Sequence, residues 1–233
     1  MDPRVLVIEQ VAVAGIGTLG PLLQQAGITL EICQAHADEP VPGEVGCDGL
    51  VVLGGPMGAC DDDQAPWLPA TRALLRRAVG SGTPVLGVCL GAQLLTVACG
   101  GQVEPGAAGP EIGVTPVMID APDDPLLQGL PRPAAFVQWH HDVTVRLPPG
   151  AVSLAHSAAY PHQVYRIGNR AWGVGFHPEA TLDSLTSWAE LTGLPGDQAD
   201  EVIRDARNQQ RQLTEAARII AANFAGIIHQ DRS

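Results

Sequence analysis

The segment that most constrains this chain is residues 84–93, which read PVLGVCLGAQ. A short apolar run typical of a strand leads into a Gly-x-Cys-x-Gly turn and then into the apolar opening of a helix. A nucleophile on so sharp a bend needs neighbours without bulky Cβ groups, and Gly87 and Gly91 flank Cys89 at that spacing. The unpaired N–H groups that open the helix favour negative charge beside the sulfur. We therefore interpret Cys89 as a nucleophilic thiolate.

Around this corner, short apolar runs alternate with stretches of helical spacing. Strands are expected at residues 4–9, 28–33, 49–53 and 84–88. Helices are expected at about 19–26, 67–79 and 93–99. Near-continuous apolar runs suit strands that are buried on both faces of a parallel sheet. The alternation of strands and helices predicts a doubly wound, mostly parallel α/β sheet.

After residue 101 the pattern changes to short apolar or alternating segments separated by turn-forming Pro and Gly, which predicts antiparallel additions to the sheet. These segments are 112–119, 135–139, 143–147, 152–156, 163–167 and 171–176. Residues from about 198 to 229 carry apolar side chains at helical spacing and charges on the other face, so one long or broken amphipathic helix is expected. We predict one domain over residues 1–195 and a helical extension, 196–233, packed on it. Use of the extension as a homodimer interface or as a docking surface is left open.

The composition narrows the class of function. A net charge of −12 argues against nucleic acid or an anionic membrane as partner, because both bind through Lys and Arg. The five cysteines are odd in number and form no CxxC pair, so neither a disulfide framework nor a zinc site is expected. The start of the chain has no signal-peptide pattern, and no run approaches a membrane span. We expect a cytoplasmic protein that acts on a small polar molecule, without metal or cofactor.

Three polar clusters follow predicted strands, at Gly54-Gly55-Pro56, at Cys89, and at His177-Pro178-Glu179. The carboxyl ends of parallel strands meet at one edge of a sheet, where ligands bind. Glu179 is near enough in sequence to hold one imidazole nitrogen of His177 while the other nitrogen faces the thiol. Nucleophile, base and orienting carboxylate are therefore all present.

These motifs carry a family resemblance. In order and approximate separation they resemble the class I (triad) glutamine amidotransferases, over the chain from the first strand to about Glu179. The wider pattern, Glu111-Ile112-Gly113 and Gln138-Trp139-His140-His141-Asp142, is similar to bacterial proteins that resemble the glutaminase domain of GMP synthase. A length of 233 residues leaves no room for an ATP-pyrophosphatase domain, so a complete GMP synthase is not expected. The resemblance implies a flavodoxin-like fold.

The resemblance also implies roles for single residues. Cys89 attacks the side-chain amide of glutamine, His177 protonates the departing ammonia, and Glu179 orients the imidazole. The backbone N–H groups of Gly55 and Leu90 hold the oxyanion. Ammonia passes to a separate synthase. Further substrate contacts are implied for Gly54, Pro56, Gln93, His140 and Asp142.

Two departures from the family pattern bear on the substrate. His141 stands where relatives commonly have Gly, and Gly175 stands where a Gln often precedes the Phe-His-Pro-Glu motif. Gly175 hints at a roomier pocket, which would suit a γ-glutamyl peptidase or hydrolase using the same triad. A non-catalytic regulatory subunit with this fold is the third hypothesis.

Overall fold

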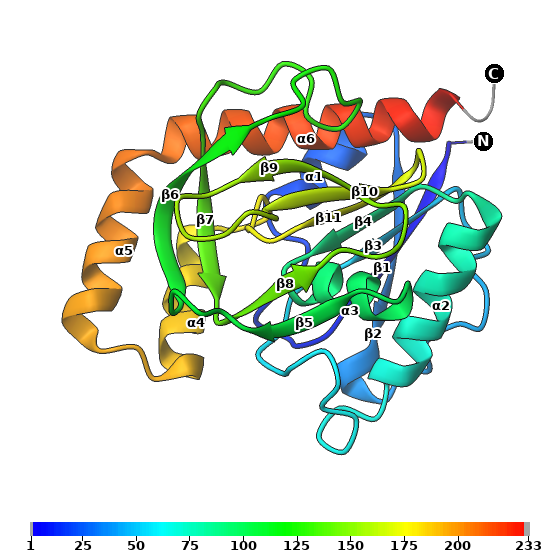
Figure 1. Cartoon of the computed structure of the whole chain (residues 1–233), viewed down its shortest axis with the longest axis horizontal. Helices are drawn as coiled ribbons and strands as arrows, with labels where there is room; N and C mark the ends of the chain where they lie inside the picture. The colour runs from blue at the N-terminus through cyan, green and yellow to red at the C-terminus, as the bar shows by residue number, and fades with distance from the viewer. Residues whose placement is uncertain (1, 231–233) are drawn as a thin grey trace.

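The structure is a computed structural model, and it describes residues 2–230. The strands are β1 (Arg4–Glu9), β2 (Thr29–Gln34), β3 (Gly49–Val52), β4 (Val85–Val88), β5 (Gln102–Pro105), β6 (Glu111–Ile119), β7 (Ala134–His140), β8 (Asp142–Arg146), β9 (Val152–His156), β10 (Val164–Ile167) and β11 (Ala171–Val174). The helices are α1 (Leu19–Gln25), the 3-10 turn η1 (Ala35–Ala37), α2 (Leu68–Ser81), α3 (Leu90–Ala98), α4 (Leu182–Thr192), α5 (Gly196–Asn208) and α6 (Gln210–Gln230). Figure 1 shows their arrangement.

The main sheet has a parallel half and an antiparallel half. Its strand order is β2-β1-β3-β4-β11-β10-β9-β6-β7, and a separate two-stranded sheet pairs β5 with β8. The first five strands in this order run parallel, and the pairings from β11 onward are antiparallel. Every residue of β3, β4 and β11 is buried, because helices cover both faces there. The predicted doubly wound sheet with antiparallel additions is confirmed.

Alternate residues of the parallel strands face two different cores. Val5 and Val7 pack with α1 and α6, whereas Leu6 and Ile8 pack with α2 and α3. The two-residue period of a strand sends successive side chains to opposite faces, so an unbroken apolar run is buried on both. Figure 1 shows α6 and α1 together on one side of the sheet and α2 with α3 on the other. With helices on both faces of the sheet, the ends of the parallel strands remain as the edge at which a site can form.

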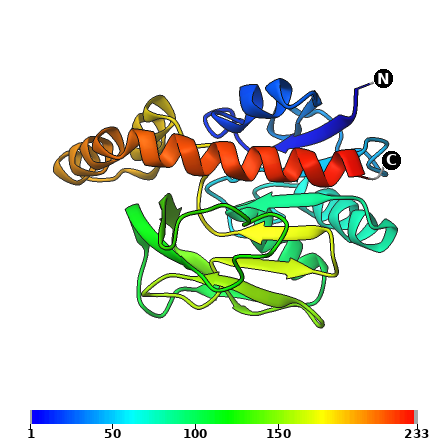
Figure 2. The same ribbon diagram turned by 90° about the horizontal axis from the view of Figure 1, so that it is seen from above.

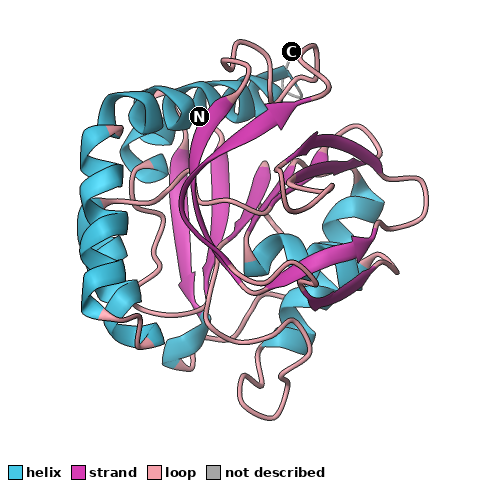
Figure 3. Ribbon diagram, turned by 60° about the vertical axis from the view of Figure 1, so that its left-hand side comes forward, coloured by secondary structure: helices cyan, strands magenta, loops and turns pink. Residues whose placement is uncertain are grey.

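The antiparallel half differs from the expectation in one element. The short strand β5 was not predicted, because its residues are mostly exposed, show no apolar alternation and end in a proline. It pairs with β8 and forms a small flap beside the main sheet. β6 is the longest strand and bends strongly as it passes from β9 to β7 (Figure 3).

The expected C-terminal helix is broken in two. The break falls at Gln209, between α5 and α6. In Figure 2, α6 runs along most of the length of the molecule. Its buried face, which includes Ile220, Phe224 and Ile228, belongs to the same core as the parallel strands. We therefore propose that residues 196–230 fold together with residues 2–195; residue 1 of the predicted domain and residues 231–233 of the predicted extension lie outside the described residues. No helix within residues 2–230 is long and apolar enough to cross a membrane.

Candidate active site

The three predicted clusters meet at one edge of the parallel sheet. Strands β3, β4 and β11 lie side by side in register, with Val52 opposite Gly87 and Val88 opposite Val174. The segments that follow them therefore leave the sheet at the same edge. This edge brings Gly54, Cys89 and His177 together, as the sequence predicts.

Cys89 occupies a strained corner that two neighbouring glycines make possible. Within residues 2–230 it is one of two non-glycine residues with positive φ, at 50°, and α3 begins directly after it. A Cβ on Gly91 would lie 1.9 Å from the backbone oxygen of Val52, and one on Gly87 would lie 2.6 Å from the oxygen of Gly91. Because α3 passes so close to the strands, only glycine fits at these two positions. The helix starts three residues earlier than expected, which places its N-terminus beside the sulfur.

His177 and Glu179 form a buried pair at the same place. The Nδ1 atom of His177 lies 2.7 Å from Oε1 of Glu179, and the two side chains are only 5% and 1% exposed. The backbone N–H of His177 donates to the carbonyl of Val137 on β7, which fixes the main chain. A Cβ on Gly54 would lie 3.2 Å from the imidazole Cε1 and 3.5 Å from Cβ of Cys89. Gly54 therefore leaves room for sulfur and imidazole to approach each other.

The charge state of His177 is set by its neighbours. Burial by itself lowers the pKa of the imidazole, but the charges of Glu179 and Cys89 raise that pKa, and the net pKa lies well above its usual value. Both neighbours therefore favour the charged form of the imidazole. Its Nε2 is buried, and besides Glu179 the polar side chain that acts on the imidazole is that of Cys89.

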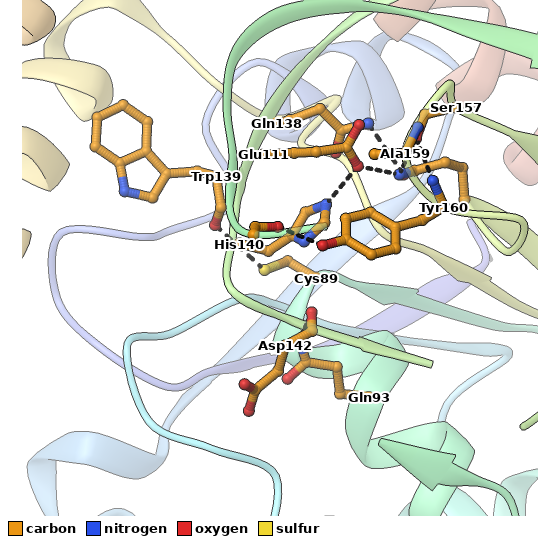
Figure 4. A network of polar contacts seen from close by, with 12 residues as sticks. Cys89, Gln93, Glu111, Gln138, Trp139, His140, Asp142, Ser157, Ala159 and Tyr160 are labelled. Carbon is orange, nitrogen blue, oxygen red and sulfur yellow. Dashed lines mark hydrogen bonds and ion pairs between the residues drawn. The ribbon is translucent and has the colours of Figure 1, made fainter. Parts of the chain in front are cut away.

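A pocket of about 470 Å³ opens onto Cys89 and His177. Figure 4 shows His140 and Tyr160 above Cys89, and Gln93 and Asp142 below it. The amide of Gln93 donates to the backbone oxygen of Asp142 at 3.0 Å, so it ties α3 to β8. The predicted residues that line the pocket are Gly55, Pro56, Cys89, Gln93, His140, Asp142 and His177.

Gly55 lies against the start of α3. A Cβ on Gly55 would lie 3.2 Å from Cδ2 of Leu90 and 3.0 Å from Cβ of Gln10. The two backbone segments expected to form the oxyanion hole are therefore neighbours, and no side chain at Gly55 separates them. Their action on an oxyanion stays a prediction.

His140 is held by a buried polar network (Figure 4). Its Nε2 lies 3.3 Å from Oε2 of Glu111, and its side chain is only 4% exposed. The amide of Gln163 donates to Glu111 at 2.6 Å and accepts from Gln138 at 3.0 Å. The network fixes the ring of His140 at the pocket wall. Direct contact of His140 or Asp142 with substrate stays a prediction.

The space beside Gly175 does not widen the pocket. A Cβ at this position would lie 2.9 Å from Oε1 of Gln163, so the Gln163 side chain fills the volume that a larger residue would take. The remaining cavity there is about 20 Å³. The expectation that Gly175 marks a roomier pocket is therefore wrong.

Two tryptophans belong to the site. Trp139 is buried and packs against Trp188, and its backbone oxygen lies 3.9 Å from the Cys89 sulfur. Trp188, on α4, was not among the predicted site residues. Its ring centroid lies 4.6 Å from that of His177. Among residues 2–230, no group of three or more His, Cys, Asp or Glu side chains is placed to hold a metal ion.

We expect Glu111→Gln to destabilise the protein in a pH-dependent way. Burial raises the pKa of Glu111, but His140, Ser157 and Gln163 lower it more, so its net pKa is below the usual value. The stabilisation is fully present above the unfolded pKa of about 4.3 and is lost as the pH falls through the folded pKa. Urea unfolding near neutral pH should show a loss of about 1–3 kcal/mol, which shrinks in acid. Glu44→Gln, at an exposed position, serves as the control; a loss that grows on acidification would contradict the assignment.

The fold and the site define an α/β protein with a cysteine at a strand-to-helix corner beside a buried His–Glu pair. The family model "Glutamine amidotransferase class-I" matches residues 20–187. The chain belongs to the class I glutamine amidotransferase family.

Individual proteins that resemble this chain are GMP synthases and glutamine amidotransferases. The chain is 34% identical over 149 residues to a glutamine-hydrolyzing GMP synthase of Porphyromonas gingivalis, covering 63% of this chain and 28% of that protein. It is 38% identical over 142 residues to that of Thermomicrobium roseum, covering 60% and 24%. The chain thus matches about a quarter of each relative's length. A glutamine amidotransferase structure from Methylobacillus flagellatus has a TM-score of 0.86 at 29% identity, covering 97% and 95%. One from Thermotoga maritima, with a TM-score of 0.84 at 24% identity over 97% and 99%, shares the fold.

Proposed function

We propose that the protein is a glutaminase that hydrolyses the side-chain amide of glutamine through a thioester on Cys89. The observation that carries this proposal is the Cys89 corner beside the His177–Glu179 pair, whose Nδ1–Oε1 distance is 2.7 Å. The pair leaves Nε2 of His177 as the nitrogen that exchanges protons with substrate. Family membership supplies independent support.

The reaction has two balanced halves. The Cys89 thiolate attacks the amide carbon, and the tetrahedral oxyanion accepts hydrogen bonds from the N–H groups of Gly55 and Leu90. The C–N bond breaks as His177 gives its proton to the leaving nitrogen, which departs as ammonia. Water then attacks the γ-glutamyl thioester while His177 takes a proton from it, and glutamate leaves as the thiolate re-forms.

A separate synthase is the proposed acceptor of the ammonia. The curated relatives named here are GMP synthases, of which this chain matches about a quarter. A pull-down with the full chain should therefore recover an ammonia-consuming synthase. Ammonia release from glutamine, measured alone and with that partner, tests the proposal; no release in either case would contradict it.

The pocket favours a second candidate, hydrolysis of γ-glutamyl amides or peptides. Its volume of about 470 Å³ lies in the range of pockets that hold drug-sized ligands. Beyond Cys89 it extends to Leu191 and Thr192 on α4, which leaves space for a second residue attached to the γ-glutamyl group. Turnover of γ-glutamyl dipeptides with indifference to glutamine would favour this candidate over the first.

Glu179→Gln should lower glutamine hydrolysis by about 10²–10⁴-fold. The amide cannot hold the imidazolium, so the pKa of His177 falls toward its usual value. Because His177 must be protonated to release ammonia, the alkaline limit of kcat/KM should move to lower pH. A kcat/KM profile against pH measures both effects. The exposed Glu190→Gln, on α4, is the matched control; an unchanged alkaline limit would count against the orienting role of Glu179.

A further inference from the structure

The indole ring of Trp188, on α4, packs against the imidazole of His177. The ring centroids of Trp188 and His177 lie 4.6 Å apart with an interplanar angle of 51°. Trp188 is only 5% exposed and lines the pocket together with Cys89. A cation within about 6 Å of an indole face is attracted by the ring quadrupole, and more strongly when water is excluded. The contact therefore favours the charged imidazole over the neutral one.

Two further contacts hold the indole in place. Its Nε1–H donates to the backbone oxygen of Val13 at 2.9 Å, which joins α4 to the loop after β1. Its ring also meets Trp139 edge-on at 5.9 Å between centroids. The helix itself starts at a capping box in which Thr181 and Ser184 exchange hydrogen bonds, two residues after Glu179. The indole is thus fixed relative to the His177–Glu179 pair.

We propose that Trp188 is a positioning residue that holds the His177 imidazolium in its pair with the Cys89 thiolate through the face of its indole ring. The inference rests on the proposed roles of Cys89 and His177. It assigns to α4 a part in the chemistry that the three sequence motifs do not include. The indole acts on His177 and need not touch the substrate.

Other titratable groups also surround His177, and the test must separate their effects from that of the indole. Glu179 and Cys89 set its charge from the strand side. His140, His141 and Asp142 line the same pocket, and Asp183 on α4 lines a cavity on the other side of His177. None of these groups is altered by a substitution at Trp188, and apolar side chains of different kinds can fill the same volume, so a difference between such variants reports on the aromatic face.

The test compares Trp188→Leu with Trp188→Phe in the full chain. Phenylalanine keeps an aromatic face but loses the hydrogen bond to Val13, whereas leucine loses both. NMR titration of the His177 ring should show its midpoint lowered by about one pH unit in the leucine variant and by much less in the phenylalanine variant. The rate of Cys89 alkylation by iodoacetamide at neutral pH, read by mass spectrometry, should fall in the same order.

Controls keep the outcome decisive. Leu185→Ala removes a buried side chain of the same helix and cluster, and it should leave both readouts unchanged. If Trp188→Leu does not fold, Trp188→Met fills the space without an aromatic face and takes its place. Equal effects of the leucine and phenylalanine variants, or none, would overturn the inference. Because neither readout needs glutamine, a lack of glutaminase activity would sink the proposed function and leave this result intact.

Discussion

Replacing Cys89 with alanine should abolish glutamine hydrolysis, with a loss of about 10⁴-fold or more. Cys89 is the one cysteine among the residues that line the pocket, and a thioester needs a thiol. Alanine fits the corner as well as cysteine does, so the fold should be kept. Ammonia release measures the activity, and circular dichroism checks the fold.

Cys99 provides the matched control for this variant. It lies at the C-terminal end of the same helix, α3, and outside the pocket. Cys99→Ala should hydrolyse glutamine at the wild-type rate. Activity that survives in Cys89→Ala would show that the nucleophile lies elsewhere.

Gly91→Ala should be strongly destabilising although it adds only one methyl group. Its Cβ would lie 1.9 Å from the backbone oxygen of Val52, and neither partner is a side chain that can rotate away. Helix α3 must then move off the sheet, which we expect to lower the free energy of unfolding by about 3 kcal/mol or more. The shift also displaces Cys89, so activity should fall with stability.

Urea unfolding measures the loss, and Gly226→Ala is its control. Gly226 is also helical, but a Cβ there meets no atom within 4 Å. That variant should gain up to about 1 kcal/mol, because alanine favours a helix more than glycine does. Equal stability of the Gly91 and Gly226 variants would contradict the packing described for the corner.

The parallel half and the site motifs were predictable because local sequence determines them. Unbroken apolar runs mark strands buried on both faces, and a strand, two glycines and an apolar helix mark the corner at Cys89. Because parallel strands end at one edge of a sheet, the meeting of Cys89 and His177 there can be predicted without information about distant contacts. Each step needs only a few neighbouring residues.

The features that were missed depend on tertiary packing. Trp188 reaches His177 only because α4 folds back over the site, and its helix carries no motif of its own. The volume beside Gly175 is filled by Gln163, whose place could not be read from the residue type at position 175. The break at Gln209 falls within a continuous helical pattern. It arises because α5 packs against β6 whereas α6 packs against α1. Such contacts join residues far apart in the chain.

The central claim is that Cys89 becomes covalently bound to a γ-glutamyl group during turnover. The most direct measurement is acid quenching of the wild-type protein in the presence of glutamine, followed by peptide mapping by mass spectrometry. We predict a γ-glutamyl adduct on the peptide that contains Cys89, absent from Cys89→Ala and unaffected by Cys99→Ala. An adduct on another cysteine, or ammonia release with no adduct on Cys89 under the same quench, would contradict the account.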